Sequence, residues 1–108
     1  MVQMQALALT LAVELPVLCV LARRLPGPAW RTALAGALAS GLTHPVAWRA
    51  ASVLAAEGYL QGLAAIEAAV VATEALVLAL LLHPGTRAAL TWSLTINASS
   101  VTVGWLLQ

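Results

Sequence analysis

The chain has 108 residues, of which 62% are hydrophobic and 8% are charged, and its formal net charge is +1. An ordinary soluble domain is about half apolar and about a quarter charged, so this composition excludes a lone soluble globule and predicts a membrane protein. A net charge so close to zero offers no basic surface, which excludes nucleic acid as a partner.

The chain divides into four apolar segments, at about 4–22, 32–48, 60–82 and 88–107. Each is close to the roughly 17–25 residues that a helix needs to cross a bilayer core. The connections are short and contain Pro and Gly, so consecutive helices should be antiparallel neighbours. We therefore expect an all-α, integral membrane, antiparallel four-helix bundle that forms one transmembrane domain over residues 1–108, with the lipid bilayer as its surroundings.

The first segment, 4–22, has no positive charge before it, unlike a secretory signal sequence, so we expect it to stay as a transmembrane helix. Its acidic residue is Glu14, near the middle of the span. Ionisable groups at membrane depth are costly and usually face a bundle interior or a wet cavity.

The second segment, 32–48, contains His44 between Thr43 and Pro45. Pro45 cannot donate a hydrogen bond to the carbonyl of Gly41, so it predicts a kink, and the Thr43 hydroxyl is a candidate partner for the freed carbonyl. The kink could open a site beside His44, or it could only shape the packing. Small residues at small-xxx-small spacing, as at Gly36 and Ser40, allow close helix contact, either within one bundle or between copies.

The third segment, 60–82, carries Glu67 and Glu74, which are seven residues apart and share a helix face. Counting about 1.5 Å per residue from opposite membrane surfaces brings His44 and Glu67 to similar depth, so we expect these two side chains to meet. The same count places Glu14 and Asn97 together one layer below, and Glu74 deeper still.

The fourth segment, 88–107, has small polar residues on one stripe: Ser93, Asn97, Ser100 and Gly104. Each of the four segments thus contributes at least one polar group to a candidate cluster in the bundle interior. The members of the predicted cluster are Glu14, His44, Glu67, Glu74 and Asn97.

Arginines and aromatic residues predict the orientation. Four of the five arginines fall in or beside the first and third connections, so the positive-inside rule places those connections in the cytoplasm and both termini outside, in a bacterial cytoplasmic membrane. The aromatic side chains agree with this, because they fall at the ends of the spans as two interfacial belts. The predicted anchors are Trp30 and Trp92 at the inner interface, and Trp48, Tyr59 and Trp105 at the outer one.

Four short patterns resemble those of small bacterial four-span membrane proteins. They are Glu14-Leu15-Pro16, the run 43–48 (Thr-His-Pro-Val-Ala-Trp), Glu67 with Glu74, and the run 97–100 (Asn-Ala-Ser-Ser). The resemblance covers the whole chain and implies a four-span bundle, but it implies no activity.

Several functions fit the predicted cluster. In an accessory or scaffold subunit, which we favour from the sequence, the polar side chains would fix the helix packing. Glu, His and Asn along an axis are also the parts of a proton or cation relay. His44, Glu67 and Glu14 form a ligand set for a divalent metal, the only cofactor that the sequence suggests. Ser100, His44 and Glu67 could form a nucleophile, a base and an orienting group, although no nucleophile elbow is present and an enzyme is the less favoured interpretation.

With almost no mass outside the membrane, the protein should act through its lateral surface or its loops. We therefore expect a homo-oligomer or a larger membrane complex.

Overall fold

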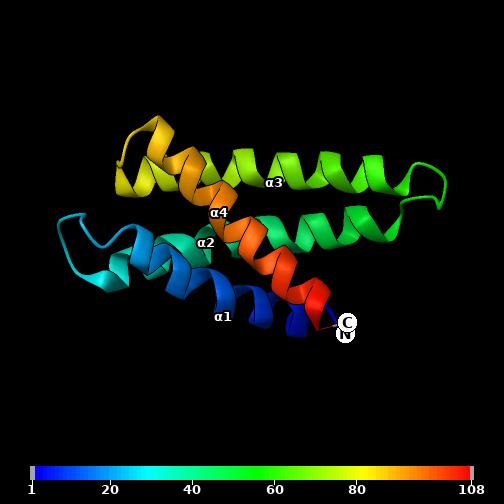
Figure 1. The fold of residues 1–108 in the computed structure, drawn as a ribbon, viewed down its shortest axis with the longest axis horizontal. Helices are drawn as coiled ribbons and strands as arrows, with labels where there is room; N and C mark the ends of the chain where they lie inside the picture. Colours follow the sequence, from blue (N-terminus) through cyan, green and yellow to red (C-terminus); the bar gives the residue numbers. More distant parts are fainter. Residues whose placement is uncertain (1, 108) are drawn as a thin grey trace.

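The computed structural model describes residues 2–107, and these form four helices joined by short connections (Figure 1). The helices are α1 (Gln3–Leu21), α2 (Ala29–Ser52), α3 (Tyr59–Leu82) and α4 (Thr86–Leu106). The expected all-α architecture of four helices is confirmed. The helix α2 is longer than the apolar segment 32–48. It continues at both ends into residues outside that segment, among them Trp30, Arg31 and Arg49, whose side chains are exposed.

The connections turn where the sequence allows left-handed backbone. Gly27 has φ +99°, Gly58 has φ +73° and Gly85 has φ +98°, which glycine adopts without a steric penalty. His83 ends α3 with φ +53°, a conformation in which a residue with a Cβ atom is strained. Pro84 follows it, so α3 cannot continue.

The helix α2 runs without a break through Pro45. The hydroxyl of Thr43 donates to the carbonyl of Ala39, at 3.0 Å, or to Glu74, rather than to the carbonyl of Gly41. The expected role of Thr43 as a partner for Gly41 is therefore wrong, because a threonine hydroxyl on a helix reaches most easily to the carbonyl four residues before it.

The four helices form a ring in which α1 and α3 each pack against α2 and α4. The helix α4 crosses the others obliquely: it starts beside the C-terminal end of α3 and finishes near the N-terminal end of α1 (Figure 1). On the α1–α2 side, leucine side chains of α1 pack onto Gly36, where an added Cβ atom would lie 2.7 Å from Leu18 Cδ2. Gly36 thus serves contact within one bundle, whereas Gly41 faces open space.

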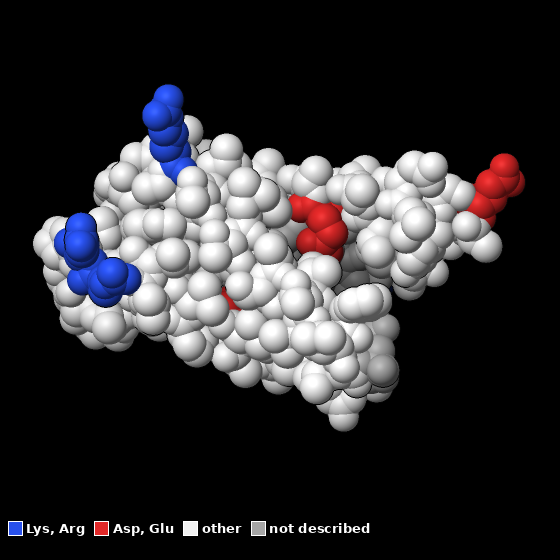
Figure 2. Space-filling model, viewed as in Figure 1, with Lys and Arg blue, Asp and Glu red and all other residues white. Residues whose placement is uncertain are grey.

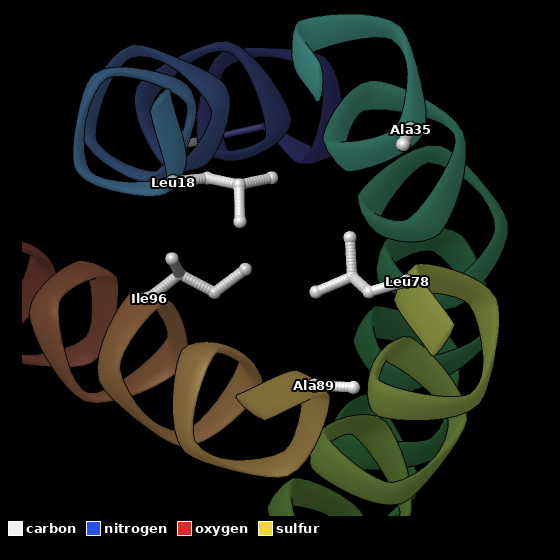
Figure 3. Packing of buried hydrophobic residues seen from close by; sticks show 5 residues of the cluster. All are labelled: Leu18, Ala35, Leu78, Ala89 and Ile96. Atoms are coloured by element: carbon white, nitrogen blue, oxygen red, sulfur yellow. The ribbon is translucent and has the colours of Figure 1, made fainter. Parts of the chain in front are cut away.

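The two halves of the ring pack differently. Near the α1–α2 and α3–α4 connections, the side chains of Leu18, Leu78 and Ile96 converge between the helices, with Ala35 and Ala89 beside them (Figure 3). All five are at most 2% exposed. Toward the α2–α3 turn, by contrast, no described residue of α3 before Glu74 is buried, and none of α2 after Thr43. The bundle is closed at one end and open at the other.

Two of the four helices, α1 and α3, are long and apolar enough to cross a membrane, with mean hydropathies of 2.0 and 2.2 over their best windows. The helices α2 and α4 are less hydrophobic because they carry more Ser, Thr, Arg and Asn.

The aromatic residues lie near the ends of the bundle, and most are exposed. Trp30, Trp48, Tyr59 and Trp105 are exposed hydrophobic residues. Trp92 differs from them, because it packs against the apolar cluster at the closed end.

Candidate functional site

Two carboxyl groups lie buried in the middle of the bundle. Glu14 of α1 is 2% exposed and Glu74 of α3 is 1% exposed. Each is followed one turn later by a residue of the apolar cluster, Leu18 after Glu14 and Leu78 after Glu74. The pair therefore lies next to the closed end, and the same helix faces that bury the leucines bury the carboxyls.

Ser40 of α2 joins the two carboxyl groups. Its Oγ atom lies 2.7 Å from Glu14 Oε1 and 3.1 Å from Glu74 Oε2. Ser40 itself is buried, at 2% exposed, in the turn before Thr43. A small residue is needed here, because α1 and α3 both approach α2 at this level.

Glu74 has two further partners. The amide Nδ2 of Asn97 donates to Glu74 Oε1 at 2.6 Å and to the Ser93 carbonyl at 2.8 Å. The hydroxyl of Thr43 lies 3.1 Å from Glu74 Oε2. Glu74 is thus the centre of the network, with contacts from both α2 and α4.

Glu14 has a second partner on α4. Ser100 Oγ lies 2.6 Å from Glu14 Oε2 and 3.1 Å from the carbonyl oxygen of Asn97. Because α4 crosses obliquely, Asn97 meets α3 while Ser100, one turn later, meets α1. The polar stripe expected on this helix is confirmed for Ser93, Asn97 and Ser100.

The network has fewer hydrogens than its contacts require. A serine or threonine hydroxyl carries a single hydrogen. Ser40 Oγ, however, lies within hydrogen-bond distance of an oxygen of each carboxyl, and both would be acceptors if both groups were ionised. Ser100 and Thr43 likewise each lie between a carboxyl oxygen and a backbone carbonyl. A proton on one carboxyl would convert one of these contacts into a hydrogen bond donated to a hydroxyl oxygen.

No arginine neutralises the pair within residues 2–107, because all five arginine side chains are exposed. Those seen in Figure 2 lie near the closed end, far from the middle of the bundle.

His44 takes part in a different contact from the one expected. Its Nδ1 atom lies 3.3 Å from Gln3 Nε2 of α1, and its ring stacks on Trp48 with 5.9 Å between ring centroids. The described hydrogen bonds include none between His44 and Glu67, so the expected His44–Glu67 centre is wrong. Equal depth does not decide which neighbour a side chain faces, and the face of α2 that carries His44 turns toward α1.

Glu67 is the half-buried glutamate of the chain. It shares the face of α3 with Glu74 and lies two turns away, toward the open end. The member of this pair that the fold places at the centre is Glu74, not Glu67. The count of residue depth along the membrane normal assumed that the four helices run parallel to one another. Because α4 crosses obliquely, Asn97 instead lies beside Glu74.

The described residues contain no group of three or more His, Cys, Asp or Glu side chains that could hold a metal ion. The expected divalent-metal set of His44, Glu67 and Glu14 is therefore wrong, because these three side chains face different neighbours.

Sequence reasoning missed the role of Ser40, which it treated only as a small residue at a helix contact. The available signal was its place on α2: it lies four residues before His44 and four after Gly36, on a stripe of small residues that has to face inward.

Comparisons with protein-family models, with curated proteins and with solved structures found no match for this chain.

Proposed function

We propose that this chain is a small four-span membrane protein that binds and releases a proton at the buried pair of Glu14 and Glu74. The observation that carries the proposal is the position of Ser40, whose single hydroxyl hydrogen is shared between the two carboxyls. A proton held by the pair supplies the missing hydrogen.

The cost of burying two charged carboxylates also favours a bound proton. Two adjacent carboxylates in a low-dielectric interior repel each other, and each loses its hydration. The hydroxyl hydrogen of Ser40 lies between the two carboxyls, and the donors of Thr43, Ser100 and Asn97 also lie near backbone carbonyls, so these hydrogens compensate the loss only in part. One proton removes one of the two charges and adds a donor, whereas a larger cation would need its own ligand shell.

The outward faces of the helices support a membrane location for all four. The exposed residues Leu34, Leu38 and Leu42 lie along α2, and Leu90 and Leu94 lie along α4. The polar residues that lower the mean hydropathy of these two helices, such as Ser40 and Asn97, are buried. A protein that is apolar outside and polar inside is suited to lipid.

The arginines favour one orientation. Arg23, Arg24, Arg31 and Arg87 lie at or next to the two connections of the closed end, so the positive-inside rule puts this end in the cytoplasm and the open end with both termini outside. The proposed location is the bacterial cytoplasmic membrane, in line with the resemblance to small bacterial four-span proteins.

Infrared spectroscopy of the protein in lipid vesicles tests the proposal directly. A protonated carboxylic acid has a carbonyl stretching band that a carboxylate lacks. We expect this band at neutral pH in the wild-type protein. It should be lost in Glu14→Gln combined with Glu74→Gln, which keeps the shape of both side chains but leaves an amide that cannot bind or release a proton.

The control is Glu57→Gln, because Glu57 is exposed in the α2–α3 turn, away from the buried pair, and this variant should keep the band of the wild-type protein. Absence of the band from wild-type protein, or its survival in the double variant, would refute proton binding at this pair.

A second candidate is the scaffold or accessory subunit, in which the same network only fixes the helix packing. It is favoured by the complete pairing of the site: among the described residues, no buried side-chain nitrogen or oxygen lacks a hydrogen-bond partner. Under this proposal the protein works within a homo-oligomer or a larger membrane complex. A stable mixed complex from native membranes, whose formation is indifferent to Glu14→Gln with Glu74→Gln, would support it.

A further inference from the structure

We infer that the buried carboxyl pair is reached from one side of the bundle only, through the open end between α3 and α4, and that Glu67 lies on this route. The inference rests on the proposed function and adds the direction from which a proton arrives. It predicts a binding site with a single entrance rather than a continuous path across the bundle.

The closed end supplies the barrier. Leu18, Leu78 and Ile96 point toward one another directly beyond the carboxyl pair, and their side chains are almost without exposed surface (Figure 3). A close-packed apolar layer has no room for water and no group that can accept a proton. A proton on Glu74 therefore has no exit toward the arginine-rich connections.

The open end supplies the entrance. Here α4 departs from α3 toward α1, and Figure 2 shows a hollow between α3 and the C-terminal half of α4 in which acidic atoms reach the surface. The described hydrogen bonds that tie α4 to α3 are those from Ser93 to the Val71 carbonyl and from Asn97 to Glu74. Beyond them, no described residue of α3 toward Tyr59 is buried.

Glu67 lies on the part of α3 that faces this opening. It is half-buried, on the same face as Val70 and Glu74. Seven residues at about 1.5 Å each separate Glu67 and Glu74 by about 10 Å, so water in the hollow has to carry the proton between them. In one exchange, Glu74 or Glu14 gives its proton to water and becomes a carboxylate, and Glu67 takes up a proton from that water and passes it to the outside.

Of the other titratable groups toward the open end, His44 of α2 is engaged with Gln3 and Trp48, and Glu57 and Tyr59 are exposed at the α2–α3 turn. From α4 the groups that face the pair are Ser93, Asn97 and Ser100, none of which titrates in the physiological range. Glu67 is therefore the group on this route best suited to relay a proton.

Cysteine labelling tests the direction of access, starting from a Cys19→Ala background that removes the native thiol. Val70→Cys and Ala79→Cys form a matched pair, because both positions are half-buried on α3, one beside the opening and one against the apolar layer. A membrane-impermeant maleimide should label Val70→Cys severalfold faster than Ala79→Cys. It should do so from the same membrane side as Tyr59→Cys and from the opposite side to Arg87→Cys.

A kinetic measurement tests the role of Glu67. After transfer of the protein into D₂O, the infrared carbonyl band of the protonated acid shifts as the proton is replaced by deuterium. Glu67→Gln should slow this shift severalfold and leave the band itself in place, whereas Glu57→Gln should change neither.

The two proposals fail in different ways. If the band is absent from wild-type protein, proton binding is refuted. If the band is present but Ala79→Cys reacts as fast as Val70→Cys, or Glu67→Gln exchanges as fast as wild type, the one-sided route through Glu67 is refuted and proton binding stands.

Discussion

Glu14 and Glu74 belong to helices that lie diagonally across the ring, yet both reach the hydroxyl of Ser40 on the helix between them. This relationship connects three helices through one side chain, and Asn97 and Ser100 extend it to the fourth. The polar network therefore fixes the relative rotation of all four helices.

The first prediction concerns Ser40→Ala. The change removes the shared hydroxyl but keeps the small side chain, so both carboxyls lose one hydrogen-bond partner in a buried place. Leaving a buried polar group unpaired costs about 1–3 kcal/mol, and we expect the free energy of unfolding to fall by that amount. Denaturant titration in detergent, followed by circular dichroism, measures it.

The control for Ser40→Ala is Ser99→Ala. The Ser99 hydroxyl donates to the carbonyl of Thr95 on its own helix and takes no part in the network. Its loss should change stability by a few tenths of a kcal/mol at most, since the half-buried hydroxyl bonds only within its own helix. Equal effects of the two variants would contradict the central place given to Ser40.

The sequence predicts the helices and the buried polar residues of this protein better than it predicts which polar residues pair. Hydrophobic segments and Pro–Gly connections predicted the four helices, because both signals are local along the chain. The polar residues that meet in the interior were also recognisable, since Glu14, Glu74 and Asn97 stand out in apolar surroundings. Their pairing was not, because it depends on helix rotation and on the crossing of α4, which no local pattern encodes.

The mistaken pairing of His44 with Glu67 has the same origin. A depth count gives one coordinate of a side chain, along the membrane normal, and says nothing of the direction in which it points. His44 faces α1, where Gln3 lies, and Glu67 faces the open side of α3. The kink expected at Pro45 stays a prediction, whereas the continuity of α2 beyond it is confirmed.

The second prediction compares two glycines of the same helix. An added Cβ atom at Gly36 would lie 2.7 Å from Leu18 Cδ2 and 2.9 Å from Leu15 Cδ2, so Gly36→Ala should force these side chains to shift, and Leu18 is fully buried in the apolar cluster. Overpacking of this kind costs about 1–3 kcal/mol. Gly41→Ala has open space around it and should be neutral or slightly stabilising, because alanine favours the helix. The melting temperatures of the two variants test this difference. A lower melting temperature for Gly41→Ala would indicate that another protein covers this face of α2.

The third prediction concerns the end of α3. His83 adopts φ +53°, where a residue with a Cβ atom is strained and glycine is not. His83→Gly should therefore raise the free energy of unfolding by about 1 kcal/mol, whereas His83→Ala should not. A melting temperature that stays the same or falls in His83→Gly would mean that the imidazole makes a stabilising contact at the closed end.

The last prediction tests the apolar layer beneath the carboxyl pair. Leu78 is fully buried between Leu18 and Ile96, so Leu78→Ala leaves a cavity next to Glu74 and should lower the free energy of unfolding by about 2 kcal/mol or more. Leu80→Ala is the control, because Leu80 is 63% exposed on the outer face of the same helix and should tolerate the change.

If the layer of Leu18, Leu78 and Ile96 is the barrier to protons, Leu78→Ala should also let protons cross the membrane of vesicles that are proton-tight with the wild-type protein. A pH-sensitive dye inside the vesicles measures this leak. A leak in wild-type vesicles as fast as in Leu78→Ala vesicles would mean that the leucine layer does not stop the proton. A leak confined to Leu78→Ala, and lost again when Glu74→Gln is added, would tie the passage of the proton to the carboxyl that lies directly above the layer.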